Sequence, residues 1–192
     1  MSFDSLPDSL RNALYDWRSS MSEQETVMLD RYSRNADRTS VPSFLLSAAT
    51  AALTDENYRF AASAAEECLR NEISDIQRFD ATESLIEAHI GTKRYDDAKV
   101  RCEDNLSLYP YVSGEIKARN GGTVPERMVC RNRYIDILVG TESAYDPALE
   151  LLDRFLGMGM ISAEDHAFRR QSLKIHRLQR SFDGVYTYTY KE

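Results

Sequence analysis

The sequence predicts an all-α protein built from antiparallel helix hairpins. Apolar residues recur at the three- and four-residue spacing of amphipathic helices along most of the chain. Hydrophobic residues make up 42% and charged residues 29% of the composition, with only 8 glycines and 5 prolines, which suits a helical protein. A short motif, Tyr-x-x-Ala, recurs three times and indicates an internal repeat. We therefore expect a single helical domain over residues 1–192.

Two N-terminal helices are expected within residues 5–33. The first covers residues 6–20, because Pro7 is tolerated in a first turn and the apolar residues behind it form one stripe. The second begins at Ser22, which forms a capping box with Glu25.

The clearest helical periodicity lies in the next two hairpins. Alanines crowd the first hairpin, over residues 42–53 and 56–70, where they favour helix and allow close packing. In the second hairpin, residues 80–90 form the first helix and Gly91 occupies the position of a left-handed C-terminal cap. The second helix covers residues 95–110 and is expected to stop at its final proline, which cannot continue a helix.

Repetition of the motif extends this pattern to a third hairpin. Tyr-x-x-Ala begins at Tyr58, Tyr95 and Tyr145, each time at the expected start of a second helix. The longer interval before Tyr145 is explained by a Gly-rich polar insertion at residues 111–126. Three hairpins would then occupy residues 42–157.

The third hairpin and a last helix complete the predicted elements. The hairpin covers residues 125–139 and 145–156, with Gly140 as its cap and Pro147 accepted in a first turn. The last helix covers residues 162–182 and begins with a Ser-x-x-Asp cap.

The last helix has two unlike faces. Its apolar side holds Phe168, Ile175, Leu178 and Phe182. Its basic side holds Arg169, Arg170, Lys174, Arg177 and Arg180, with Leu173 among them. One interpretation is a capping helix that turns a polar outer face to solvent. The other is a basic surface that docks an acidic partner or a membrane.

The final residues, 183–192, differ from everything before them. The segment VYTYTY alternates and favours β structure, so we expect an extended, strand-like tail. It is either a disordered end, a segment lying along the helices, or a strand that pairs with a partner or another copy. Its candidate docking residues are Tyr186, Tyr188 and Tyr190.

The second hairpin resembles a tetratricopeptide repeat. That family places a small residue late in the first helix, an aromatic residue at the start of the second, an alanine three residues later and a proline at the end. The matching residues are, in order, Ala88, Tyr95, Ala98 and Pro110. Thr82 and Ile86 depart from the aromatic residue and the glycine that are usual there. Over residues 42–157 the resemblance implies hairpins stacked as a short right-handed solenoid.

In this family the first helix of each hairpin lines a concave groove that holds peptide or helical partners. The positions that the resemblance places in the groove are Leu46, Thr50, Glu83, Glu87, Arg133 and Ile137. The two glutamates of the central hairpin would favour a basic segment. The lysine and asparagine clamp of the family's chaperone-tail binders is not implied, because glutamates stand in that hairpin instead.

Charge and cysteine usage bound the partners and the compartment. The net charge of -7 and the pI near 5.1 argue against a general nucleic-acid binder. No apolar run approaches the roughly 20 residues of a membrane span. The N-terminus lacks the apolar core of a signal peptide. Three widely spaced cysteines do not form a disulfide framework, and Cys68 and Cys102 fall at apolar positions. We expect a cytoplasmic or otherwise intracellular protein.

The common catalytic patterns do not occur in the sequence. None of the three histidines stands in a metal-binding helical arrangement, and there is no Cys-x-x-Cys pair. A nucleophile elbow and a phosphate loop are also missing. Glu83 and Glu87 lie one helical turn apart, which is more typical of a solvated face than of a cation site. The sequence therefore predicts no catalytic residue, no metal ligand and no cofactor.

These observations leave three functional hypotheses. The first is a non-enzymatic scaffold or adaptor that binds a peptide or a helical segment in a concave groove. The second is a subunit or regulatory domain that associates through the basic last helix and the YTYTY tail, self-association included. The third is a helical enzyme of unrecognised type, which would show a deep enclosed pocket with converging polar groups.

Overall fold

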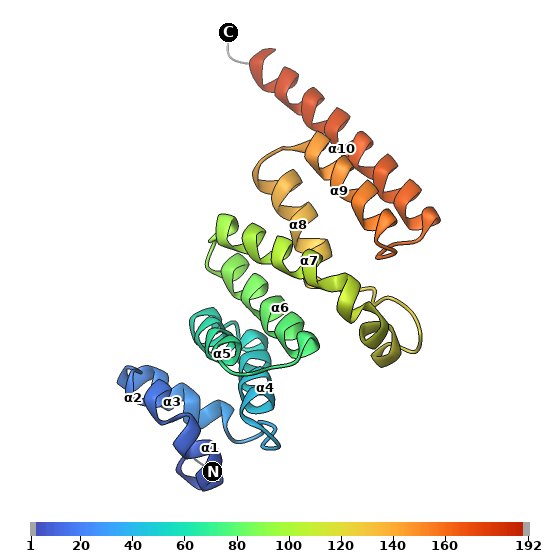
Figure 1. Ribbon diagram of the computed structural model, residues 1–192. Coiled ribbons are helices and arrows are strands. Elements are labelled where there is room, and N and C mark those ends of the chain that lie inside the picture. Colours follow the sequence, from blue (N-terminus) through green and yellow to red (C-terminus); the bar gives the residue numbers. More distant parts are fainter. Residues whose placement is uncertain (1–2, 190–192) are drawn as a thin grey trace. The chain divides into compact units, whose positions relative to one another are not determined.

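The computed structural model describes residues 3–189, with side chains up to Ser181, and this part of the chain is helical and contains no strand (Figure 1). The chain divides into two compact units, Met1–Cys130 and Arg131–Glu192, where one helical domain was expected. No helix in the described residues is long and apolar enough to cross a membrane.

Unit 1 contains most of the helices. They are η1 (Phe3–Ser5), α1 (Asp8–Ala13), α2 (Tyr15–Ser19), α3 (Glu23–Tyr32), α4 (Val41–Thr54), α5 (Tyr58–Arg70), α6 (Asp75–Gly91) and α7 (Tyr95–Arg119). The boundary between the units falls inside α8 (Val129–Asp136). Unit 2 continues with η2, a π-helical segment (Ile137–Thr141), α9 (Tyr145–Gly157) and α10 (Ala163–Thr189).

Most predicted helix starts are confirmed to within two residues, because short-range capping determines them. The first helices of the second and third hairpins are exceptions, since they begin at Asp75 and Val129 where residues 80 and 125 were expected. Ser22 and Glu25 form the expected capping box of α3. At the start of α10 the Ser162 hydroxyl accepts a hydrogen bond from the Asp165 backbone N–H, with the two atoms 3.0 Å apart. The single helix expected over residues 6–20 is instead broken into α1 and α2 at Leu14, whose side chain is fully buried.

The core of unit 1 lies between successive helices. α5 packs against both α4 and α6, α6 packs against α7, and α4 also contacts α6. The contacts are close because small residues face one another; the fully buried alanines of α4, α5 and α6 include Ala48, Ala49, Ala52, Ala61, Ala64, Ala65, Ala81 and Ala88. Phe60 contacts the rings of Trp17 and Tyr32, with centroids 6.0 and 5.0 Å away, and so joins the N-terminal helices to this core.

The three turns before Tyr58, Tyr95 and Tyr145 share one backbone geometry. Two residues before each tyrosine φ is positive, at 57°, 60° and 55°, in Glu56, Lys93 and Ser143 respectively. The residue directly before each tyrosine has φ of -84°, -87° and -88° and ψ of 68°, 66° and 71°. Each tyrosine is the first residue of α5, α7 or α9. Tyr-x-x-Ala therefore marks one recurring helix-turn-helix connection.

Both predicted glycine caps are wrong. Gly91 is the last residue of α6, and the left-handed conformation belongs to Lys93. A Cβ atom at Gly91 would overlap the ring of Tyr58, so glycine is needed there for close packing. Gly140 lies within η2.

The predicted stop at Pro110 is also wrong, because α7 continues to Arg119. Proline in a helix costs about 3 kcal/mol, since it removes a donor and crowds the preceding turn. Apolar side chains on both sides of Pro110, namely Tyr109, Val112 and Ile116, are at most 7% exposed, and their burial offsets that cost. Figure 1 shows α7 bending between its green first part and its olive end. The insertion was expected over residues 111–126. Residues 111–119 instead belong to α7, and the loop covers residues 120–128.

The strand-like tail expected over residues 183–192 is not confirmed. α10 continues as a helix to Thr189. A helix satisfies its backbone hydrogen bonds internally, whereas a lone strand has no ladder to join. Tyr190 and the side chains of Tyr186 and Tyr188 lie outside the described residues.

Candidate functional site

The main candidate site is a hollow of about 530 Å³ in unit 1. Two first helices of hairpins, α4 and α6, form one side, and the end of α7 and the loop 120–128 form the other. The lining residues are Leu46, Ser47, Thr50, Ile76, Phe79, Asp80, Glu83, Ser84, Ile116, Arg119, Asn120, Pro125, Arg127 and Met128. Its volume is in the range of pockets that hold small ligands or a few peptide side chains.

The floor of the hollow is apolar. Ile76, Phe79, Ile116 and Met128 are between 2% and 7% exposed, and Leu46 is partly buried beside them. Ile116 belongs to the segment 111–126 that was expected as an insertion, and Met128 belongs to the helix that was expected over residues 125–139. The continuation of α7 therefore supplies part of the apolar lining.

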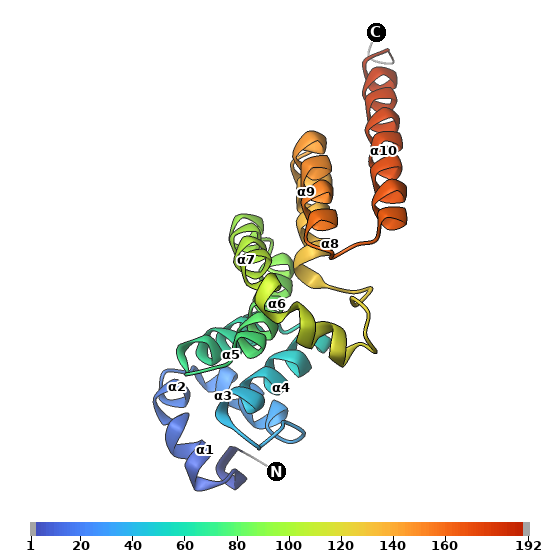
Figure 2. The same cartoon turned by 45° about the vertical axis from the view of Figure 1, so that its right-hand side comes forward.

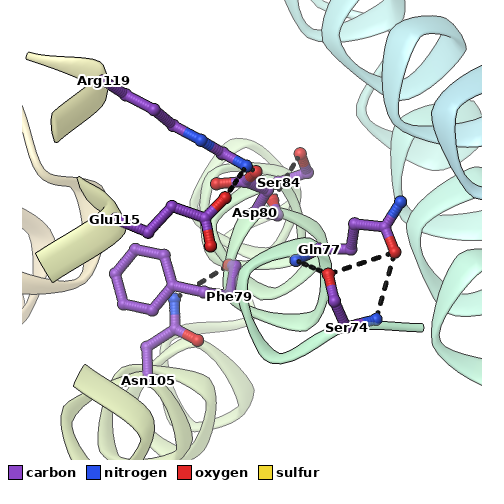
Figure 3. A network of polar contacts seen from close by, with 8 residues as sticks. All are labelled: Ser74, Gln77, Phe79, Asp80, Ser84, Asn105, Glu115 and Arg119. Carbon is purple, nitrogen blue, oxygen red and sulfur yellow. Dashed lines mark hydrogen bonds and ion pairs between the residues drawn. The ribbon is translucent and has the colours of Figure 1, made fainter. Parts of the chain in front are cut away.

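An ion-pair network holds the end of α7 against α6 (Figure 3). Arg119 donates to the Asp80 carboxylate at 2.9 Å and to the Glu115 carboxylate at 2.7 Å. Burial raises the pKa of Asp80, while the hydrogen bond and positive charge of Arg119 act in the opposite direction. The Arg119 and Asp80 side chains are 50% and 41% exposed, so their ion pair joins α7 to α6 at the wall of the hollow but contributes little to stability.

The carboxylate of Glu83 accepts hydrogen bonds from other residues of unit 1. Its two oxygens accept hydrogen bonds from the backbone N–H groups of Val129, at 2.6 Å, and Cys130, at 2.8 Å. These are the first N–H groups of α8, which have no partner inside that helix and carry the positive end of its dipole. Asn105 donates to Glu83 at 3.0 Å and to the Phe79 carbonyl at 3.1 Å. Burial raises the pKa of Glu83, and the three N–H donors oppose that effect.

Charges around the hollow balance. Asp80 and Glu83 contribute two carboxylates, and Arg119 and Arg127 contribute two guanidinium groups. The hollow therefore does not present an acidic centre to a ligand.

Three of the six predicted groove residues come together. Leu46, Thr50 and Glu83 line the hollow, with Thr50 exposed on α4, whereas Glu87 is not among its lining residues. Arg133 and Ile137 belong to unit 2, where Ile137 is 1% exposed and Arg133 pairs with Asp136. Residues missed by the sequence argument include Asp80 and Arg119, and nothing in the local spacing links these two, which are far apart in the chain.

The basic side of α10 faces α9 and its preceding turn. Arg170 donates to Asp153 at 2.6 Å, Arg177 donates to Asp146 at 2.7 Å, and Arg180 donates to the Ser143 hydroxyl at 2.7 Å. Arg169 pairs with Asp165 of the same helix, and Lys174 is exposed. The capping interpretation placed these side chains outward. In the structure two of the five, Arg170 and Arg177, contact carboxylates of α9, and Arg180 contacts the turn before it.

Metal ligands do not cluster among the described residues, and two of the cysteines have raised pKa values. No three His, Cys, Asp or Glu side chains lie where they could hold a metal ion within residues 3–189. The cysteines are buried and form no disulfide within the described residues. Burial raises the pKa of Cys68 to about 11 and raises that of Cys102 as well. Thiols with raised pKa values are poor nucleophiles.

Comparison with known proteins adds no relative. No protein-family model, no curated protein and no solved structure matches this chain.

Proposed function

We propose that this protein is a non-enzymatic scaffold of tetratricopeptide-like hairpins that binds a peptide or short helix in the hollow of unit 1. One observation carries the proposal. The hollow lies on α4 and α6, the first helices of two successive hairpins, and these are the helices that line the groove in the family that the sequence resembles.

Repetition of local geometry supports the repeat assignment. The turns before Tyr58, Tyr95 and Tyr145 have nearly identical backbone angles. In unit 1, contact between α4 and α6 is what stacking of consecutive hairpins requires. A right-handed solenoid is the arrangement we propose for the two hairpins of unit 1.

The lining of the hollow defines the ligand class. An apolar floor suits one or two apolar side chains of a peptide, and the hydroxyls of Ser47 and Thr50 and the amide of Asn120 suit its backbone polar groups. Because Glu83 is hydrogen-bonded to α8 and the lining charges balance, we propose a peptide of mixed charge with apolar anchors in place of a strongly basic segment.

Blocking the hollow tests this proposal. Thr50 is exposed on α4 and lines the hollow, so Thr50→Trp places a large ring at its edge without disturbing the core. Peptides are first selected from a random displayed library on the wild-type protein, and their affinities are then measured by fluorescence anisotropy. We expect Thr50→Trp to weaken binding at least about tenfold, the effect of losing one good contact region.

Thr54→Trp is the matched control. Thr54 is exposed on the same helix one turn later, makes the same kind of side-chain bond to the carbonyl four residues before it, and does not line the hollow. Its affinity for the peptides should equal that of wild type. Failure to select any peptide, or equal binding by the Thr50 and Thr54 variants, would contradict the proposal. A Glu83 variant is unsuitable here because it would also release the start of α8.

A further inference from the structure

A second cavity of unit 1, of about 390 Å³, is lined by α5, α6 and α7. These three helices follow one another in the chain, and α6 packs against both of the others (Figure 2). None of the residues that line this α6–α7 cavity also lines the hollow of the proposed function. The residues that decide its chemistry are Leu69 of α5, Arg78 of α6, and Arg101, Asp104, Asn105 and Leu108 of α7.

The amide oxygen of Asn105 is a buried acceptor that lacks a donor. Asn105 is fully buried, and its amide nitrogen donates to the Phe79 carbonyl and to the Glu83 carboxylate, both of which are acceptors. The oxygen therefore points the other way, and Figure 3 shows it turned from Phe79. It has no hydrogen-bond partner among the described residues. Because an unpaired buried acceptor costs free energy, a ligand N–H at this position is favoured.

The charged side chains of the α6–α7 cavity favour an anion. Arg78 is exposed on α6, and its guanidinium group forms no hydrogen bond or ion pair with another described residue. Arg101 pairs with Asp104 of the same helix, at 3.0 Å. Two guanidinium groups and one carboxylate thus line the cavity, so its lining carries one positive charge although the chain as a whole is acidic. A ligand group with one negative charge complements this lining, and Arg78 has all of its N–H donors left for it.

The register of the two helices brings the cation, the acceptor and an apolar surface together. Asn105 bonds to the carbonyl of Phe79, the residue directly after Arg78, so Arg78 and Asn105 lie at about the same level of the hairpin. Leu108 follows Asn105 by three residues and shares its helix face. Leu69 lines the same cavity, and both leucines are partly buried. A fitting ligand therefore carries an anionic group, an N–H group and an apolar group side by side.

We infer that the α6–α7 cavity binds an N-acylated amino acid with an apolar side chain. The ligand carboxylate pairs with Arg78, the amide N–H on the adjacent carbon donates to Asn105 Oδ1, and the side chain lies against Leu69 and Leu108. An unmodified amino acid is disfavoured because its ammonium group adds a positive charge to a positive lining. This ligand chemistry occurs in free N-acyl amino acids and at the C-terminus of a peptide. The site is separate from the hollow, so either proposal can fail without the other.

Ligand analogues test each contact without altering the protein. Titration of the full chain with N-acetyl-leucine, followed by heteronuclear NMR, should shift the signals of α6 and α7 around the cavity, including the side-chain Nε–H of Arg78. N-acetyl-leucinamide lacks the carboxylate, and the ester analogue has an oxygen atom in place of the N–H. Each should bind at least about tenfold more weakly, the effect of losing one hydrogen bond that involves a charged or buried group. The tripeptide alanyl-alanyl-leucine separates the two sources, because tighter binding of the tripeptide identifies a peptide C-terminus and tighter binding of N-acetyl-leucine identifies a free N-acyl amino acid.

A matched pair of substitutions tests the cation. Arg78→Gln should weaken N-acetyl-leucine binding at least about tenfold, whereas Arg59→Gln should bind as wild type does. Arg59 is exposed on α5 and does not line the cavity, so both variants lose the same charge from a helix surface. Absence of NMR shifts at millimolar N-acetyl-leucine overturns the proposal. Equal binding by Arg78→Gln and wild type overturns it too, and equal binding of the ester analogue would show that Asn105 Oδ1 meets only water.

Discussion

The hairpins of unit 1 and the α9–α10 pair of unit 2 solve the packing of two adjacent helices in opposite ways. In unit 1, α4, α5 and α6 meet through fully buried alanines and rings such as Phe60. In unit 2, α10 meets α9 through hydrogen bonds and ion pairs, among them Arg170 with Asp153 and Tyr145 with His176, and leaves Phe168 exposed. The first arrangement is stabilised by apolar burial, whereas the second is joined by exposed polar pairs, which contribute little to stability.

This difference shows that amphipathicity identifies the faces of a helix without assigning them to a neighbour. α10 has the expected two faces, but the carboxylates Asp146 and Asp153 on α9 attract its basic side. The apolar side is then left for another surface. For unit 1 no such competition arises, since the faces of α5 and α6 that meet are both apolar.

The largest difference in stability is expected when phenylalanine is replaced by alanine in the two regions. Phe60→Ala removes a fully buried ring and should lower the free energy of unfolding by about 3–5 kcal/mol. Phe168→Ala removes a ring that is 70% exposed and should change it by less than about 0.5 kcal/mol. Urea unfolding measures both. Similar losses for the two variants would show that Phe168 is buried in the monomer.

The second-largest difference in stability is expected between two glycine-to-alanine substitutions at the ends of helices. Gly91 ends α6 against the ring of Tyr58, and Gly157 ends α9 with no atom within 4 Å of its added Cβ. Gly91→Ala should destabilise by about 1–3 kcal/mol through overpacking. Gly157→Ala should be neutral or stabilise by up to about 1 kcal/mol, because alanine favours helix.

A double-mutant cycle assigns the cause of the Gly91 effect. On a Tyr58→Ala background the Gly91→Ala substitution should lose most of its cost, since the ring that it meets is gone. An unchanged cost in that background would place the strain elsewhere in α6.

The smallest expected effect is on the pKa of Asp153, which pairs with His166 in unit 2. His166 and then Arg170 lower the pKa of Asp153 below its ordinary value of 3.8. Because the folded-state pKa is lowered, this carboxylate stabilises the α9–α10 contact above pH of about 3.8, and the contribution is lost as the pH falls through the lower folded value.

Carboxyl NMR titration of the His166→Gln variant measures that effect. The Asp153 pKa should rise toward 3.8, since a 2.7 Å hydrogen bond to the carboxylate is weakened. Lys174→Gln is the control, because Lys174 is exposed on α10 and does not contribute to the shift. An unchanged Asp153 pKa in the His166 variant would show that the two side chains do not meet in solution.

Local chemistry made several features predictable. Ser22 and Glu25 cap α3 as expected, and Tyr58, Tyr95 and Tyr145 each begin a helix, because these signals act over three or four residues. A capping box at Ser74 and Gln77 was available to the same reasoning and was missed. Half of the predicted groove residues, Leu46, Thr50 and Glu83 among six, line the same hollow.

Other features needed the tertiary structure. Pro110 stays inside α7 since Val112 and Ile116 are buried beyond it, and Gly91 is required by the ring of Tyr58, which lies far away in the sequence. Glu83 accepts hydrogen bonds from the first N–H groups of α8, which lie 46 residues later in the chain. Arg119 pairs with Asp80, which lies 39 residues earlier. No local pattern encodes such partners.

By itself, then, the sequence determined that this protein is helical, where most helices begin, and that one turn recurs three times. Those properties follow from hydrogen bonds and side-chain periodicity within a few residues. Only the tertiary structure decided which face of α10 is covered, how far α7 extends and which residues meet at the hollow. These outcomes depend on contacts between residues that lie far apart in the chain. In α10 the basic side lies on Asp146 and Asp153 of α9, whereas Phe168 stays exposed.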